Sequence, residues 1–204
     1  PGNLKYVKSF SGGSEATENA VKFARQYEFV RNNRGKCTVI GRWQGFHGNT
    51  FGAMTVSGIT YRRNIYGPML GHSVKIPPCY CYRCDWGLTY GKCNLECARA
   101  LRKAIRQEGP ENVLAFIAEP VVGAALGAVP AVPEYFPLIR EICDEFDVLF
   151  IADEVMTGFG RTGANFGVDH WNVVPDIIAT AKGISGGYTP LAAVLLRDKI
   201  IDLL

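Results

Sequence analysis

Apolar residues recur at helical spacing in three stretches of the chain. This spacing predicts amphipathic helices near residues 15–31, 95–108 and 133–146. Gly109-Pro110 ends the second of these helices, since neither residue favours continuing one. The apolar face of the first helix consists of Ala16, Ala20, Phe23, Ala24, Tyr27 and Val30.

Short apolar runs alternate with these helices and predict strands. They cover residues 6–10, 36–40, 113–119, 148–152, 176–180 and 191–196. The stretch 41–94 is rich in Gly, Pro and aromatic residues and predicts loops with one short helix near 49–56. Strands that are apolar throughout and alternate with helices favour an α/β fold: a mostly parallel sheet between two helical layers.

Length and composition fit one globular domain. The chain has 204 residues, of which 48% are hydrophobic and 20% charged, and its net charge of +3 is too small and too scattered to favour nucleic acid. No apolar run approaches the ~18 residues that cross a bilayer, so we expect no membrane partner. An odd number of cysteines, seven, does not suggest a disulfide framework, and we expect reduced thiols in the cytoplasm.

Residues that could bind a ligand or take part in catalysis lie at the ends of the predicted strands. Ser11–Ser14, Asp153 and Lys182 lie just after predicted strands, and Glu119 ends one. In open α/β sheets, ligands bind beyond the carboxyl ends of the strands. The sequence therefore predicts a binding site at that edge.

The turn Ser11-Gly12-Gly13-Ser14 leads from a strand into a helix. Glycines allow a ligand to approach the backbone, and a helix start offers unpaired N–H groups and a positive dipole end. A phosphate would suit this place. The alternative is an ordinary tight turn in which Ser14 caps the helix.

Asp153 and Glu154 end a buried strand, where a carboxylate needs a cation or hydrogen-bond donors. A ring N–H⁺ of a ligand could pair with Asp153, and Arg161 is a plausible internal partner for Glu154. Lys182 is either a surface lysine or, as a neutral amine, a nucleophile toward carbonyls. Together, a phosphate cradle, a buried acid and a strand-end lysine are the anchors that pyridoxal 5′-phosphate needs.

Several blocks of the sequence resemble the class III pyridoxal-phosphate-dependent aminotransferases, which have fold type I. Two long segments carry the resemblance, Phe150-Ile-Ala-Asp-Glu-Val-Met-Thr-Gly-Phe-Gly-Arg-Thr-Gly163 and Pro175-Asp-Ile-Ile-Ala-Thr-Ala-Lys-Gly183, in which Lys182 stands 29 positions after Asp153. Three shorter segments add to it: Ser11–Glu18, Gly45–Thr50 and Glu119–Gly123. They occur in the family's order and span nearly the whole chain.

The resemblance implies roles for individual residues. Lys182 would form the Schiff base with the cofactor, and Asp153 would keep the pyridine nitrogen protonated. The other implied contacts are phosphate binding by Gly12, Gly13 and Ser14, packing on the ring faces by Phe46 and Val155, and positions near the ring for His47, Glu119 and Met156. Met156 stands where some members carry a Gln that reaches the ring hydroxyl, and Met cannot donate that hydrogen bond.

The implied reaction moves an amino group from an amino acid or ω-amine to a 2-oxo acid, pyruvate or 2-oxoglutarate, by a ping-pong mechanism. Members that act on ornithine or γ-aminobutyrate commonly carry Glu where this chain has Ala124, so the resemblance favours the ω-amino acid or amine:pyruvate group. Other pyridoxal-phosphate reactions on the same fold (aminomutase, epimerase, decarboxylating transaminase) stay open.

The resemblance also predicts the place of this chain in the whole protein. Residues 1–204 match the central part of the aspartate aminotransferase-like large domain, and we expect an N-terminal segment and a small C-terminal domain to be missing. The family builds its sites across a homodimer or a dimer of dimers, with a phosphate-binding Thr from the neighbouring subunit.

A cysteine cluster gives a competing interpretation. Cys81 and Cys84 have zinc-ligand spacing, and Cys93 and Cys97 could complete the set. Against zinc, Cys97 falls on a predicted helix, so free thiols in a loop are the alternative.

Overall fold

A seven-stranded sheet runs through the computed structural model, which describes residues 4–204. Its order is β1-β9-β8-β7-β4-β2-β3. The strands are β1 (Leu4–Phe10), β2 (Thr38–Arg42), β3 (Val74–Ile76), β4 (Val113–Ala118), β7 (Leu149–Asp153), β8 (Ile177–Thr180) and β9 (Ala192–Arg197).

One strand of this sheet, β9, runs against its two neighbours, β8 and β1, and the other strands share one direction. Residues 181–191 separate β8 from β9, and so short a connection suits an antiparallel return better than a helical crossover. Because β1, β4, β7 and β8 point the same way, their carboxyl ends meet at one edge. The prediction of a mostly parallel sheet is confirmed.

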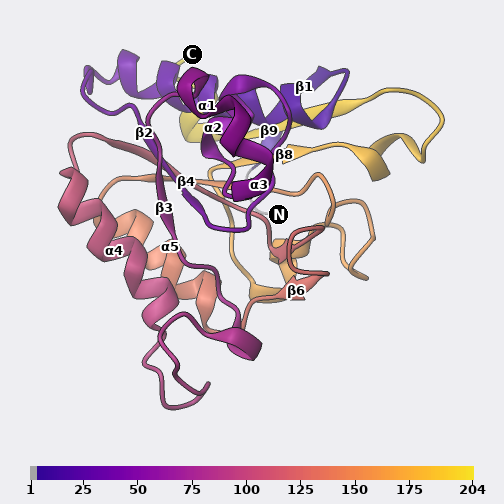
Figure 1. The fold of residues 1–204 in the computed structure, drawn as a ribbon. Coiled ribbons are helices and arrows are strands. Elements are labelled where there is room, and N and C mark those ends of the chain that lie inside the picture. Colours follow the sequence, from indigo (N-terminus) through magenta and orange to yellow (C-terminus); the bar gives the residue numbers. More distant parts are fainter. Residues whose placement is uncertain (1–3) are drawn as a thin grey trace.

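Helices cover both faces of the sheet (Figure 1). On one face lies α1 (Gly13–Val30); on the other lie α4 (Glu96–Glu108) and α5 (Tyr135–Glu145). Side chains alternate along β4: Phe116 packs in the core with α4 and α5, whereas Ile117 packs in the core with α1. The predicted three-layer architecture is therefore present.

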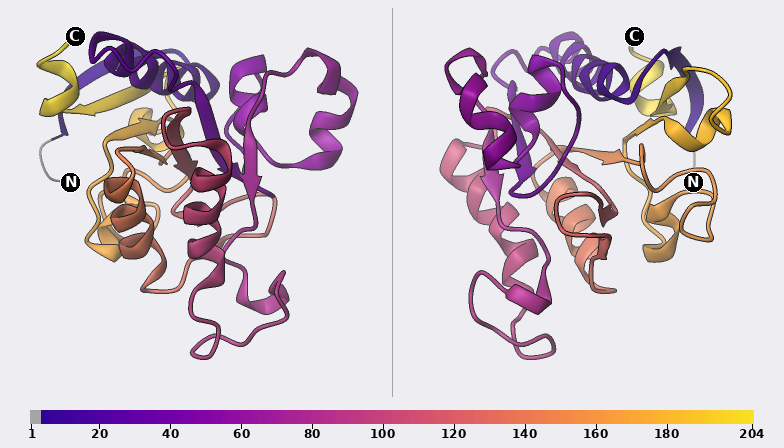
Figure 2. Two further views of the ribbon diagram at one scale, coloured as in Figure 1. Left: turned by 90° about the vertical axis from the view of Figure 1, so that its left-hand side faces the viewer. Right: turned by 45° about the vertical axis from the view of Figure 1, so that its right-hand side comes forward.

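Shorter elements connect these layers (Figure 2). They are α2 (Phe51–Val56), α3 (Thr60–Arg63), η1 (Asn64–Met69), η2 (Cys81–Arg83), the ribbon of β5 (Val121–Val122) and β6 (Val129–Pro130), η3 (Gly167–Trp171), η4 (Lys182–Ser185) and α6 (Asp198–Ile201).

The sequence prediction differs from the structure at several boundaries. Helix α1 begins at Gly13 rather than near residue 15, and Val30 is exposed rather than part of the apolar face. Strand β2 is shifted by two residues, to 38–42. The three-residue strand β3 was not predicted, because a segment that short, followed by Pro77-Pro78, carries little periodicity.

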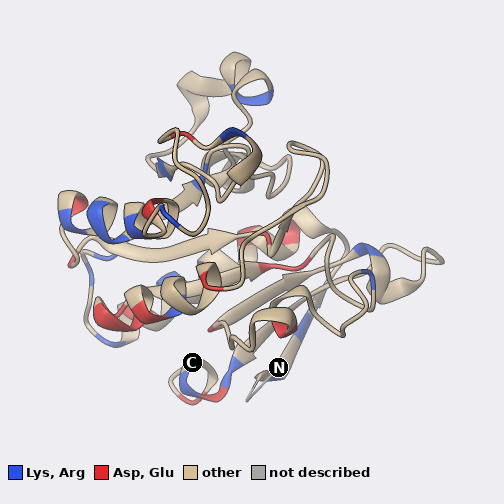
Figure 3. Ribbon diagram, turned by 90° about the horizontal axis from the view of Figure 1, so that it is seen from below, with Lys and Arg blue, Asp and Glu red and all other residues tan. Residues whose placement is uncertain are grey.

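Charges of both signs are interleaved over the ribbon (Figure 3). Arg102 on α4 is bonded to Glu145 and Glu141 on α5, so part of this charge joins two neighbouring helices. Among residues 4–204, no helix is both long and apolar enough to cross a bilayer.

Asp176, just before β8, is a fully buried carboxylate that ties several elements together. It bonds to Arg140 of α5 at 2.7 Å, to Lys199 of α6 at 2.6 Å and to the N–H of Phe150 at 2.8 Å. Burial alone would raise the pKa of Asp176, but the charges of Arg140 and Lys199 outweigh it and hold the pKa below its usual range.

Asp176→Ala should therefore lower the free energy of unfolding by about 3 kcal/mol, because it removes three cation contacts at once and leaves the buried N–H of Phe150 without its acceptor. Asp144→Ala is a matched control: Asp144 also binds Arg140 but is largely exposed, and its loss should cost less than about 1 kcal/mol. Because folding lowers the pKa of Asp176, its contribution is complete at neutral pH and declines as the pH falls below about 4. Urea unfolding at several pH values measures the stability of the two variants and its dependence on pH. Equal losses of unfolding free energy for the two variants would contradict this account.

Candidate active site

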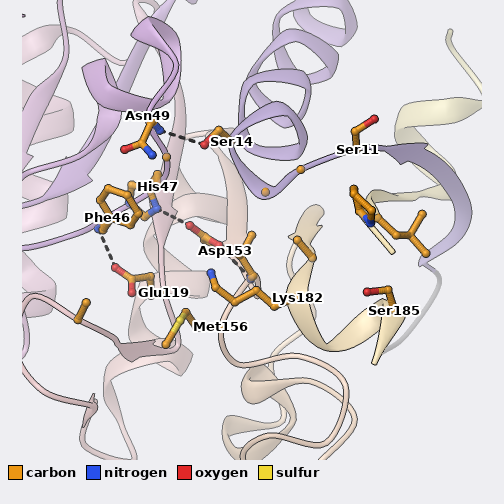
Figure 4. A pocket seen from close by; sticks show the side chains of 18 of the residues that line it. Ser11, Ser14, Phe46, His47, Asn49, Glu119, Asp153, Met156, Lys182 and Ser185 are labelled. Atoms are coloured by element: carbon orange, nitrogen blue, oxygen red, sulfur yellow. Dashed lines mark hydrogen bonds and ion pairs between the residues drawn. The ribbon is translucent and has the colours of Figure 1, made fainter. Parts of the chain in front are cut away.

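A cavity of about 590 Å³ opens at the carboxyl edge of the sheet (Figure 4). Every site residue predicted from the sequence lines it: Gly12, Gly13, Ser14, Phe46, His47, Glu119, Asp153, Val155, Met156 and Lys182. The chain segments that supply them follow β1, β2, β4, β7 and β8, so the shared strand direction brings them together.

The glycine turn places the start of α1 at the cavity. Gly12 is the N-cap residue in an extended conformation, and no side chain caps the helix there, so the predicted alternative of a Ser14 cap is wrong. Ser14 Oγ instead accepts the N–H of Asn49 at 3.0 Å. The first N–H groups of an 18-residue helix thus face the cavity without a side-chain cap, which suits an anion.

Gly13 stands in close contact with the end of β7. A Cβ at this position would lie 2.9 Å from Val155 Cγ1 and 3.4 Å from Ala181 Cβ. No side chain fits without displacing Val155, and the absence of one lets α1 reach the residues that follow Asp153.

Asp153 is buried and held in a defined orientation. Its Oδ2 accepts a hydrogen bond from His47 Nδ1 at 2.7 Å, and its Oδ1 accepts one from the N–H of Val155 at 3.0 Å. His47 is itself 2% exposed, and its Nε2 has no hydrogen-bond partner among residues 4–204. The pair places a carboxylate, supported by donors on both oxygens, in the wall of the cavity.

Glu119 organises the part of the cavity wall next to Phe46 and His47. Its two carboxyl oxygens accept the N–H groups of Phe46 and Gly123, each at 2.8 Å. Burial raises the pKa of Glu119, an effect that the charge of His47 opposes and that of Asp153 strengthens. Glu119 therefore fixes both the backbone of Phe46 and the turn that leads to Ala124.

Glu154 has a structural role with partners other than the predicted one. Arg161 is exposed, so the expected ion pair is wrong. Glu154 accepts hydrogen bonds from the N–H groups of Gly167 and Val168, at 2.8 and 2.9 Å, and from Thr157 Oγ1. Burial raises the pKa of Glu154, and these bonds oppose the rise. The sequence predicts a basic partner for this carboxylate and does not reveal that backbone N–H groups bind it instead.

Lys182 opens η4 directly after the strand β8 and Ala181. Its φ of +47° lies in the left-handed region, which a lysine seldom adopts and which is found most often where a site requires it. The side chain is exposed and points into the space between Asp153, Glu119 and Met156 (Figure 4). The amine is thus presented to the cavity and does not lie along the outer surface.

Arg62 is a cavity residue that sequence reasoning missed. It belongs to α3, within the region predicted as loops, and carries no motif signal. Its guanidinium carbon lies 4.8 Å from the centre of the Phe46 ring, a cation–π contact at the cavity wall. Asn49 and Ser185 also line the cavity and were not predicted.

The zinc interpretation of the cysteines receives no support. Within the described part of the chain, no group of three or more His, Cys, Asp or Glu residues is arranged to hold a metal ion. Cys97 lies in the first turn of α4, as expected, and all seven cysteines are free.

Comparison with known proteins identifies the family. The Aminotransferase class-III family matches residues 2–204, and the chain belongs to it. It is 37% identical over 204 residues to a putrescine–pyruvate aminotransferase of Pseudomonas aeruginosa, covering 100% of this chain and 44% of that protein.

Solved structures agree with this result. A thermostable (S)-enantioselective omega-transaminase from Thermomicrobium roseum matches with a TM-score of 0.93 and 36% identity, over 100% of this chain and 45% of that one. An amine transaminase from an uncultivated Pseudomonas species, in its PLP-bound form, matches with a TM-score of 0.93 and 38% identity, over 97% of this chain and 44% of that one. The chain thus spans less than half the length of the relatives it matches.

Class III aminotransferases depend on pyridoxal 5′-phosphate, and the residues of the cavity fit that group. The uncapped start of α1 suits the phosphate of this cofactor. The space next to Gly12 is open, because a Cβ built on this residue would have no atom within 4 Å. The Asp153 carboxylate suits a ring N–H⁺, the Phe46 ring and Val155 offer apolar faces, and Lys182 offers an amine for the aldehyde.

Gly13→Ala tests the contact between α1 and β7. The new methyl group would overlap Val155, and we expect a loss of about 1 to 3 kcal/mol in the free energy of unfolding. Gly67→Ala is the matched control, since a Cβ there meets nothing within 4 Å. Chemical denaturation of both variants measures the difference, and unchanged stability for Gly13→Ala would show that Val155 gives way freely.

Proposed function

We propose that the protein to which this chain belongs is a pyridoxal-phosphate-dependent aminotransferase. The observation that carries the proposal is the convergence of Lys182, Asp153 and the uncapped start of α1 on one cavity. Each feature alone has an ordinary structural explanation. Their meeting at the carboxyl edge of a mostly parallel sheet favours a single ligand with an aldehyde, a basic ring nitrogen and a phosphate.

When bound, pyridoxal 5′-phosphate supplies an aldehyde that condenses with amines and a ring that withdraws the electron pair left by a departing proton. Gly12, Gly13 and Ser14 would hold the phosphate, and Phe46 and Val155 would supply apolar contacts to the ring. Asp153 keeps a proton on the ring nitrogen, and the donors from His47 and Val155 hold its carboxylate in place for that task.

Lys182 has two tasks in the proposed reaction. Its amine would bind the aldehyde of the cofactor in the resting enzyme. Once an amino donor had taken that place, the free Nζ would accept the proton from the carbon that bears the donor's amino group and donate it again later in the reaction. His47 and Glu119 lie beside this path and shape the cavity wall, with Met156 as an apolar neighbour.

The proposed substrates are an amino acid or ω-amine as donor and a 2-oxo acid, pyruvate or 2-oxoglutarate, as acceptor, used in turn by a ping-pong mechanism. Ala124 leaves the cavity wall without a carboxylate at that position. Arg62, over Phe46, provides a cation that could attract the carboxylate of a 2-oxo acid. A putrescine–pyruvate enzyme and an omega-transaminase among the relatives support this substrate group.

We also propose a homodimer, or a dimer of dimers, in the cytoplasm. Large apolar side chains are exposed along α3, η1 and the loop before β9, where Tyr61, Ile65 and Tyr188 have exposures of 73%, 83% and 95%. An apolar surface of this kind favours burial against a second copy. Free cysteines suit a reducing compartment.

Borohydride reduction of the cofactor-loaded, full-length protein should attach the cofactor covalently to Lys182, and mass spectrometry of a digest locates it. Lys182→Ala should lose the adduct and reduce transamination by at least about a thousandfold, because no other group replaces both of its tasks. Lys22→Ala, on the exposed side of α1, should retain both. An adduct on a different lysine would overturn the assignment.

Asp153→Asn should reduce turnover by at least about a hundredfold while weakening cofactor binding much less, because the negative charge matters most when electron density enters the ring. Asp85→Asn, in an exposed loop, is the control. Single-turnover rates and a cofactor titration separate the two effects. Near-normal turnover of a folded Asp153→Asn variant is the result that would remove Asp153 from the mechanism.

A further inference from the structure

Arg42, the last residue of β2, is a buried cation that does not line the large cavity. It is 1% exposed and forms no ion pair with Asp or Glu within residues 4–204. Its Nη2 donates to the carbonyl oxygen of Glu119 at 2.5 Å, and its Nε has no hydrogen-bond partner in the same part of the chain. Burying a guanidinium without a carboxylate costs free energy, so stability alone does not account for an arginine at this position.

Two aromatic rings of α5 pack near this guanidinium. The Arg42 guanidinium carbon lies 5.9 Å from the centre of the Tyr135 ring and 6.0 Å from that of the Phe136 ring, and both rings are fully buried. Contact with aromatic rings offsets part of the cost of burial. Because the guanidinium is planar and enclosed, the directions of its N–H groups are fixed, and one of them is aimed at the Glu119 carbonyl.

This hydrogen bond lies where the pairing between β2 and β4 has already ended. The two strands pair only as far as Ile40 of β2, and the pairing of β4 with β7 ends at Ala118. The Glu119 peptide lies beyond both pairings, so the Arg42 side chain supplies a donor that a neighbouring strand does not. The bond thereby joins the ends of β2 and β4, the two strands that lead to Phe46 and Glu119.

The contacts around Arg42 form a closed ring. Its carbonyl oxygen accepts the N–H of Gly45 at 3.1 Å, in the turn that leads to Phe46. The N–H of Phe46 donates to the Glu119 carboxylate at 2.8 Å, and the Glu119 carbonyl accepts from the Arg42 guanidinium. Phe46 is therefore tied to Arg42 twice, once along the main chain and once through Glu119. A segment that is fixed at two points has little freedom to shift.

We propose that Arg42 is a positioning residue of the large cavity, which acts through Glu119 to fix the backbone of Phe46. Phe46 lines the cavity, so its position sets the shape of the apolar wall. One step rests on the proposed function, namely that this wall packs on pyridoxal 5′-phosphate. The effect of Arg42 on Glu119 and Phe46 belongs to the chain itself and does not depend on the reaction.

Amide hydrogen exchange in the full-length protein without cofactor tests the first part. Arg42→Met removes the donor at similar volume. The N–H groups of Phe46 and Gly123, which the Glu119 carboxylate binds, should then exchange at least about tenfold faster. The buried N–H of Phe150 on β7 should keep its rate, because it reports on the stability of the whole fold. Unchanged exchange at Phe46 would overturn the proposal, and an equal increase at Phe150 would show a general loss of stability and overturn it as well.

Arg42→Lys keeps the buried charge and serves if Arg42→Met does not fold. Its ammonium is shorter and has no rigid plane, so exchange at Phe46 should still rise at least about threefold. Arg106→Met is the matched control: it removes an arginine from the exposed surface of α4, and exchange at Phe46 should not change. A Lys variant with the rate of the unaltered protein would contradict the role of the guanidinium.

A double-mutant cycle on the cofactor-loaded protein tests the last step. Glu119→Gln can accept only one of the two N–H groups, so this variant and Arg42→Met should each weaken cofactor binding and change the circular dichroism of the bound cofactor. Because Arg42 acts through Glu119, the double variant should bind within about twofold of the weaker single variant. Losses that multiply would show independent roles and overturn this step. If the unaltered protein binds no cofactor, the proposed function fails, while the exchange result stands on its own.

Discussion

The contact between Gly13 and Val155 is the constraint on which the rest of the site depends. Helix α1 lies against the sheet through Ala16, Ala20 and Ala24, which are fully buried and small enough for close approach. At its start even an alanine is too large, because Val155 occupies the space. The positive end of the helix therefore lies close to the residues that follow β7, at the same cavity as the Asp153 carboxylate. Without this approach, an anion site and an acid site would exist on the same chain but could not bind one ligand.

The buried carboxylates have different kinds of partner at the two ends of the strands. Asp176, at the amino end of β8, is surrounded by Arg and Lys side chains and joins helices to the sheet. At the carboxyl edge, Asp153, Glu119 and Glu154 form no ion pair with an Arg or Lys of residues 4–204; N–H groups, Thr157 and His47 satisfy them. Backbone donors stabilise an acid without neutralising it, so a ligand can still meet a negative charge there. The first arrangement supports folding, and the second leaves a charge available for chemistry.

Arg42 connects the candidate active site to a region of the fold that has no part in it. The arginine donates to the carbonyl of Glu119 at 2.5 Å, and its guanidinium carbon lies about 6 Å from the ring centres of Tyr135 and Phe136 on α5. Helix α5 is thereby joined to the end of β4 that carries Glu119, whose side chain holds the backbone of Phe46 at the cavity.

The sequence by itself determined the layers, the mostly parallel sheet and the strand-end residues of the cavity, since each of these is encoded locally. Helical and strand periodicities are short-range patterns, and Gly12-Gly13, Asp153 and Lys182 each follow a strand whose end the pattern predicts. Only the tertiary structure decided which partners these residues meet. Glu154 accepts hydrogen bonds from the N–H groups of Gly167 and Val168 and does not pair with Arg161, and the Arg62 guanidinium lies over the Phe46 ring. Such pairings depend on how loops distant in sequence pack together, and residue spacing along one chain carries no information about that packing.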